Sequence, residues 1–135
     1  MKTQKITDNG QVLAIIIKDA EWEKGLHFIS AAEDFQQVGT WGYDQGHKLA
    51  PHIHLNTPPR TVTRTQEVIF IKNGRLRADI YNEDKNFVTS VELNKGDTVI
   101  LLRGGHGYEI LENDTQVLEI KNGPYLGAEK DRERI

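Results

Sequence analysis

The chain contains no cysteine among its 135 residues, which excludes disulfide frameworks, thiolate metal sites and cysteine nucleophiles. Long apolar runs are also lacking. The longest, residues 12–17, is far too short to span a bilayer, and the polar segment 1–11 lacks the apolar stretch of a secretory signal. We therefore expect a cytoplasmic protein with no membrane partner.

The sequence has no excess of positive charge. It holds 17 Lys and Arg against 20 Asp and Glu, with a formal net charge of −3, and only 7% aromatic residues. A nucleic-acid surface needs clustered basic residues, so we predict no nucleic-acid partner. Gly-x-Ser-x-Gly and the Gly-Lys-Ser/Thr end of a phosphate loop are absent too, which leaves those two chemistries unsupported.

Short segments rich in β-branched residues, separated by turn residues, dominate what is present. This spacing is typical of an all-β sandwich or small barrel, and the length indicates one domain over residues 1–135. Asn73-Gly74 predicts a hairpin between two of the strands, and residues 82–85 predict another. The predicted strands are residues 11–18, 26–30, 36–43, 49–55, 61–72, 75–81, 86–92, 98–102, 107–111 and 115–121.

The most informative feature is the His52-Ile53-His54 motif, followed by Glu67 and His106. Side chains alternate along a strand, so His52 and His54 would point to the same face, about 7 Å apart. Two imidazoles and a carboxylate form an ordinary ligand set for a divalent transition metal. The residue types do not choose among Fe, Mn, Ni, Co and Zn.

The same residues resemble the motifs of the cupin superfamily. Gly46, five residues, His52-x-His54, and then Glu67, six residues, Gly74 follow the outer spacings of the first cupin motif. Gly96-Asp97, Gly104 and His106 resemble the second motif, although His106 comes one residue earlier than the motif places its histidine. Three features depart from the pattern. Twelve residues separate His54 from Glu67, more than in the motif; Leu102 replaces a proline; and the closing asparagine is absent, with Ile110 nearby.

The resemblance implies a double-stranded β-helix, the jelly-roll barrel of cupins, with an N-terminal strand arm. The barrel would span residues 36–121, and residues 1–10 and 128–135 would be peripheral. In such a barrel the metal ligands would be His52, His54, Glu67 and His106. The resemblance and the exposed edge strands also predict a homodimer. Residues 65–74 and 121–127 further resemble small stand-alone cupins associated with bacterial surface-sugar biosynthesis.

The reaction stays open at this point. A metal-dependent enzyme on a small polar substrate, such as a sugar or nucleotide-sugar, would be an isomerase, an epimerase or an oxygenase. The alternatives are a non-catalytic sugar-binding module and a metal-free sugar isomerase or epimerase that uses a histidine base. Candidate pocket residues are Arg60, Arg64, Gln66 and Tyr108, and Arg103 stands before a Gly-Gly turn where it could hold an anion.

Overall fold

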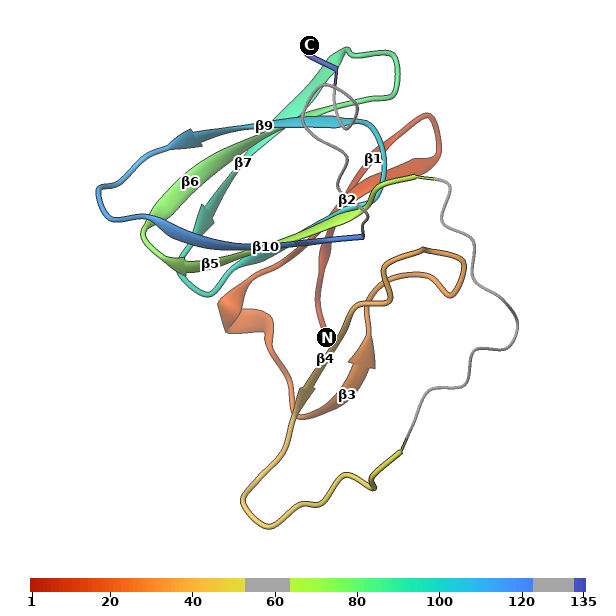
Figure 1. The fold of residues 1–135 in the computed structure, drawn as a ribbon, viewed down its shortest axis with the longest axis vertical. Helices are drawn as coiled ribbons and strands as arrows, with labels where there is room; N and C mark the ends of the chain where they lie inside the picture. The colour runs from red at the N-terminus through yellow and green to blue at the C-terminus, as the bar shows by residue number, and fades with distance from the viewer. Residues whose placement is uncertain (53–63, 123–132) are drawn as a thin grey trace.

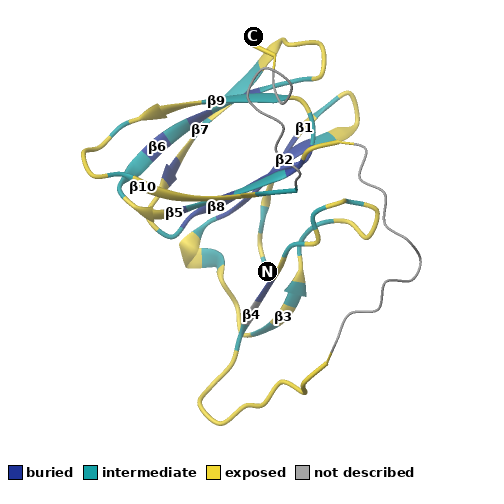
Figure 2. Cartoon of the chain, viewed as in Figure 1, coloured by how far each residue is buried: buried dark blue, intermediate teal, exposed yellow. Residues whose placement is uncertain are grey.

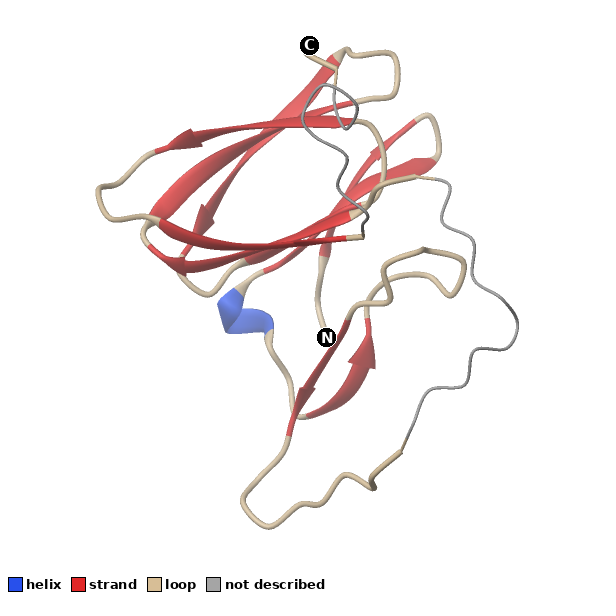
Figure 3. Ribbon diagram, viewed as in Figure 1, coloured by secondary structure: helices blue, strands red, loops and turns tan. Residues whose placement is uncertain are grey.

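The computed structural model describes residues 1–52, 64–122 and 133–135 (Figure 1). Its described part consists of antiparallel strands and one turn of 3-10 helix, η1, at Asp19–Glu21 (Figure 3). No helix within these ranges is long and apolar enough to cross a membrane. The strands are β1 (Gln4–Asp8), β2 (Gln11–Ile17), β3 (Gly25–Phe28), β4 (Gly39–Gly42), β5 (Glu67–Asn73), β6 (Arg75–Tyr81), β7 (Phe87–Asn94), β8 (Thr98–Leu101), β9 (Gly105–Ile110) and β10 (Gln116–Lys121).

The strands form three antiparallel sheets. A five-stranded sheet has the order β1-β2-β8-β5-β10, a three-stranded sheet has the order β7-β6-β9, and β3 and β4 pair separately as an arm. Figure 1 shows the five-stranded and three-stranded sheets facing each other, with the arm below them. The predicted all-β class is confirmed. Among the described residues no strand pairing closes the two facing sheets into a barrel.

The main core lies between the two facing sheets. Ile69 and Ile71 of β5 and Leu76, Ala78 and Ile80 of β6 alternate along their strands and are at most 2% exposed (Figure 2). Leu13, Ile16, Val99 and Leu93 from β2, β8 and β7 complete this cluster. This is the period-2 pattern expected of strands with one face in a core.

The five-stranded sheet is apolar on its outer face as well. Ile15 and Ile17 of β2 and Ile100 of β8 form a second cluster there, against Ile29 and Val38 of the arm. Burial on both faces explains why β2 reads as a continuous apolar run rather than an alternating one. The arm therefore covers part of this sheet. The predicted barrel bounds, residues 36–121, do not match the structure, because β2 lies inside the five-stranded sheet and β4 belongs to the arm.

The turns divide into two kinds. Residues 82–86 join β6 to β7 as a hairpin, which confirms the prediction at NEDK. The hairpin predicted at Asn73-Gly74 is wrong, because β5 pairs with β8 and β10 whereas β6 pairs with β7 and β9. This turn carries the chain from one sheet to the other. Gly74 adopts φ +78°, which suits a tight turn of either kind.

Two of the predicted strands differ from the structure. Residues 49–52 are not a strand, and 53–55, with His54, lie outside the described residues. The strand predicted over 61–72 begins only at Glu67; residues 64–66 are irregular, and 61–63 are not described. Residues 1–10, predicted to be peripheral, contain the edge strand β1.

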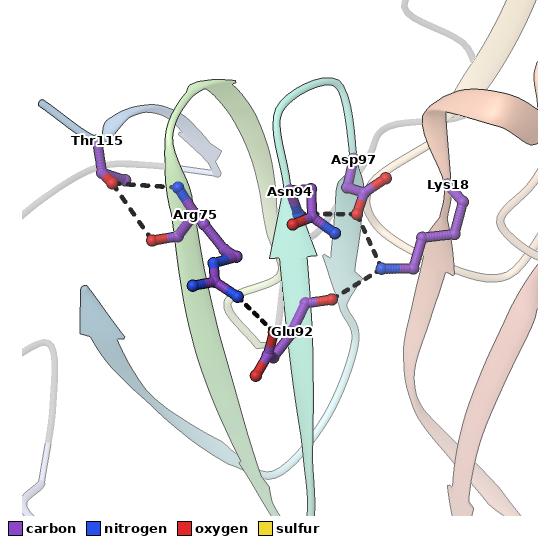
Figure 4. A network of polar contacts seen from close by, with 6 residues as sticks. All are labelled: Lys18, Arg75, Glu92, Asn94, Asp97 and Thr115. Atoms are coloured by element: carbon purple, nitrogen blue, oxygen red, sulfur yellow. Dashed lines mark hydrogen bonds and ion pairs between the residues drawn. The ribbon is translucent and has the colours of Figure 1, made fainter. Parts of the chain in front are cut away.

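A polar network holds the end of β2 against the turn between β7 and β8 (Figure 4). The carboxylate of Asp97, 4% exposed, accepts hydrogen bonds from Lys18 Nζ at 2.8 Å and from the backbone N–H groups of Asp19 and Asn94 at 3.0 and 2.9 Å. Lys18 Nζ also donates to the carbonyl of Glu92 at 2.7 Å. A buried carboxylate with three donors is well satisfied, so the network links both facing sheets.

Candidate functional site

A cavity of about 670 Å³ opens where the core ends between the two facing sheets. Glu67 is the first residue of β5 and shares its inward face with Ile69 and Ile71. His106 of β9 lies opposite Ile80 of β6, whose side chain is also in the core. The core therefore gives way to polar side chains at this end. The lining residues are Thr65, Glu67, Tyr81, Leu101, Arg103, Gly104, Gly105, His106, Gly107, Tyr108, Glu119, Lys121, Glu133, Arg134 and Ile135.

Glu67 and His106 meet in this cavity, although they belong to different sheets. His106 Nε2 lies 3.1 Å from Glu67 Oε2, and the two side chains are only 29% and 14% exposed. Lys121, directly opposite Glu67 in the register of β10 and β5, places Nζ 4.0 Å from Glu67 Oε1 and 3.4 Å from Glu119 Oε1. The site is thus a carboxylate pair bridged by one ammonium, with an imidazole on the opposite side.

Tyr108 follows His106 by two residues and points to the same side of β9. Their ring centroids are 5.3 Å apart. Partial burial raises the pKa of the Tyr108 phenol well above its usual range, and the negative charges of Glu67 and Glu119 raise it further. The phenol therefore stays protonated at neutral pH and can donate a hydrogen bond into the cavity.

Only part of the predicted ligand set comes together. Glu67 and His106 are adjacent, as predicted, but His52 is exposed, with Nδ1 3.1 Å from the carbonyl oxygen of Ala50, and it does not line the cavity. His54 lies outside the described residues. Within the described ranges no group of three His, Asp or Glu side chains is placed to hold a metal ion. The four-ligand metal site remains a prediction.

The structure places the predicted pocket residues in different surroundings. Tyr108 lines the cavity. Arg64 lines a second hollow beside it, of about 470 Å³, and pairs with Glu83 at 2.9 Å. Gln66 lines neither: it is 2% exposed, and its side-chain oxygen accepts the Gln36 N–H at 2.7 Å, so its role is structural. Arg60 is outside the described residues.

Two charged residues of the site were not predicted from the sequence. Glu119 and Lys121 sit at alternate positions of β10, on the same side as Glu67 of the neighbouring strand. Their alternation within QVLEIK marks one face of a strand, but only the pairing of β10 with β5 shows that this face meets Glu67. The alternation of charged residues can be seen in the sequence. The register between β10 and β5, which places these residues beside Glu67, cannot.

Comparison of this chain with protein-family models, with curated proteins and with solved structures finds no match. The cupin resemblance therefore rests on the motif residues alone, and the function must be argued from the cavity.

Proposed function

We propose that the chain is a metal-dependent enzyme with a cupin-type jelly-roll barrel that acts on a small polar substrate, such as a sugar, in this cavity. The observation that carries the proposal is the contact between Glu67 and His106 across the two sheets. A carboxylate and an imidazole that converge from separate strands on one cavity are the donors that divalent transition metals bind.

The distance between the two groups fits this role. Metal bonds to imidazole nitrogen and carboxylate oxygen are about 2.0–2.2 Å long, so two donors at right angles on one ion are about 3 Å apart. His106 Nε2 and Glu67 Oε2 are 3.1 Å apart without any movement. His52 and His54 would supply the remaining ligands. A metal bound by this set would act as a Lewis acid or an oxygen-binding centre.

The chain's other residues would bind and orient the substrate. The protonated phenol of Tyr108 can donate to a hydroxyl or carbonyl oxygen in the cavity. Lys121 offers an ammonium that is 20% exposed beside Glu67. The buried core residues behind Glu67 exclude water from one side of the site, which strengthens such polar contacts.

Elemental analysis of freshly purified protein tests the proposal. We expect close to one transition-metal ion per chain, lost in the His52→Ala/His54→Ala double variant and reduced in His106→Ala and Glu67→Gln. The matched control is His27→Ala/His47→Ala, which removes two histidines that lie outside the predicted ligand set. A wild-type protein that holds no metal, even after reloading with Fe, Mn, Ni, Co and Zn, would show that the metal proposal is wrong.

The contact between Glu67 and His106 also favours a second candidate function. Glu67 and His106 already form a direct pair, which is the arrangement of a general base held by a carboxylate. In this case the protein is a metal-free sugar isomerase or epimerase. Metal-stripped protein would then exchange the proton next to the carbonyl of a keto sugar in D₂O, and Glu67→Gln would not. A protein that binds sugars but lacks this exchange and holds no metal is the non-catalytic binding module.

We also infer that the chain forms a homodimer. β10 is an edge strand with an exposed face: Leu118 is 53% and Ile120 49% exposed. In the arm, Leu26 and Phe28 are 53% and 73% exposed. An edge strand with adjacent apolar side chains is a favourable surface for pairing with a second copy.

A further inference from the structure

The cavity mouth carries an arginine that the proposed chemistry does not use. Arg103 follows β8 and the buried Leu102, and its backbone N–H donates to the carbonyl of Leu13 at 3.2 Å, beside the Leu102 N–H at 2.8 Å. These bonds fix the base of the side chain. Arg103 lines both the main cavity and the second hollow, which have in common Thr65, Arg103, Gly104, Gly105, Glu133 and Ile135.

Arg103 differs from the neighbouring cations in its partners. Arg64 pairs with Glu83, Lys85 pairs with Glu133 at 2.6 Å, and Lys121 pairs with Glu119. Arg103, like Arg134, also lines the cavity but forms no ion pair with any residue in the described ranges. A half-buried guanidinium without a carboxylate partner keeps its five donors available to a ligand.

The Gly104-Gly105 turn holds Arg103 at the rim of the cavity. Gly104 adopts φ +74°, and a Cβ at this position would collide with the carbonyl oxygen of Tyr81. A Cβ at Gly105 would meet Ile135 Cδ1, so the turn that follows Arg103 packs closely against its neighbours.

We propose that Arg103 binds an oxyanion, a carboxylate or a phosphate group, of the molecule that occupies the Glu67–His106 cavity. The guanidinium fork matches the paired oxygens of both groups. Arg103 selects an anionic substrate and positions it, while Glu67 and His106 lie at the reacting end. The inference rests on the proposed function, since it assigns the substrate class of the same cavity.

The test is titration of the full-length protein, as purified, with inorganic phosphate and separately with acetate, followed by NMR of the arginine Nε–H signals. The Arg103 signal, assigned by its absence from Arg103→Gln, is expected to shift with phosphate, with acetate or with both, and the better ligand distinguishes the two sources of the oxyanion. Arg103→Gln is expected to weaken this binding about tenfold or more, since a hydrogen bond to a charged group is lost. Arg103→Lys is expected to retain part of it, without bidentate geometry.

Arg75→Gln is the matched control, because Arg75 pairs with Glu92 and does not line the cavity. It is expected to bind as the wild type does. Failure of both anions to bind, or equal binding by Arg103→Gln and the wild type, overturns the inference. The metal content of each sample separates the two proposals. Arg103-dependent binding in a protein that holds no metal supports the inference and contradicts the metal-dependent function. Loss of metal in Arg103→Gln would show that Arg103 supports the metal site indirectly and would overturn its role as an anion site.

Discussion

Glu67 and His106 occupy the point where an apolar core changes into a polar cavity. Each continues the inward-facing row of its sheet, in which Ile69 follows Glu67 on β5 and Ile80 lies opposite His106. Their side chains are held by the core on one side and remain open on the other. This pair of titratable groups therefore faces the cavity with the apolar core behind it.

Tyr108 gives a prediction that concerns protonation. Its pKa is raised by burial and by Glu67 and Glu119, above the value of about 10 that an unfolded tyrosine has. Its contribution to stability is therefore complete below about pH 10 and is lost as the pH rises further, because only the unfolded state gives up the proton. We expect absorbance titration to show a tyrosine that ionises late, and we expect Tyr108→Phe to remove this late step.

The free energy of unfolding checks the same assignment. Between about pH 8 and pH 10.5, the wild type should lose more stability than Tyr108→Phe. If Tyr108→Phe instead removes a tyrosine that titrates near its ordinary pKa, the environment assigned to Tyr108 is wrong.

The sequence predicted the residues of the site better than their surroundings. Glu67, His106 and Tyr108 were found because their types and spacings carry chemistry without knowledge of the fold. Gln66 does not line the cavity, because its side chain is buried in the irregular segment before β5 and accepts a hydrogen bond from the Gln36 N–H. Lys121 was missed because its contact with Glu67 depends on a strand pairing between residues 54 positions apart.

At the scale of elements, the turn between β5 and β6 has a tightly constrained geometry. Gly74 has φ +78°, and a Cβ there would lie 2.7 Å from Thr115 Cα and 2.9 Å from Thr115 Cβ. Thr115 Oγ1 also accepts the Arg75 N–H at 3.2 Å and donates to the Glu112 carbonyl at 2.7 Å. The crossing between sheets therefore packs directly against the turn that leads into β10.

A comparison of Gly74→Ala with Gly10→Ala separates the cost of backbone strain from the cost of packing against Thr115. Gly10 has nearly the same φ, +76°, but a Cβ there meets nothing within 4 Å. We expect Gly10→Ala to cost about 1–2 kcal/mol of unfolding free energy, from the left-handed conformation alone. Gly74→Ala should cost about 1–3 kcal/mol more, because Thr115 must also move. Urea unfolding measures both; equal losses would show that the contact with Thr115 is unimportant.

Strand positions were largely predictable, and their partners were not. β6 was predicted with its exact bounds and β2 to within one residue, because alternation and β-branched residues are local signals. The hairpin at Asn73-Gly74 was predicted wrongly because the same dipeptide suits any turn that needs positive φ. No local sequence signal distinguishes a hairpin turn within one sheet from a turn that carries the chain to the facing sheet.

At the scale of the whole molecule, the elements in the described ranges cover only part of the outer face of the five-stranded sheet. The arm packs on the side of β2 and β8, whereas Leu118 and Ile120 on β10 remain about half exposed. These side chains lie opposite Phe70 and Val68 in the register, so the apolar surface continues across β5. This is the surface on which the proposed homodimer depends.

The Leu118→Glu/Ile120→Glu variant tests the dimer. We expect wild-type protein to elute with twice the chain mass in light-scattering chromatography and the variant to be monomeric, because two carboxylates would be desolvated on pairing. Phe87→Glu is the control, since Phe87 is 59% exposed but lies on β7 of the other sheet. A monomeric wild type would contradict the proposal, as would a variant that remains dimeric.

The position of β2 in its sheet has a consequence for synthesis of the chain. Ala14 pairs with Leu101, and Lys18 reaches Asp97, so this apolar strand has neighbours that are made much later. At a translation rate of about 5–20 residues per second, β2 waits about 4–17 s for β8 to be made. Throughout this time five consecutive buried residues, 13–17, have only β1 as a neighbour within the described sheet. We therefore expect β2 to be open to chaperones that bind apolar segments until β8 is made.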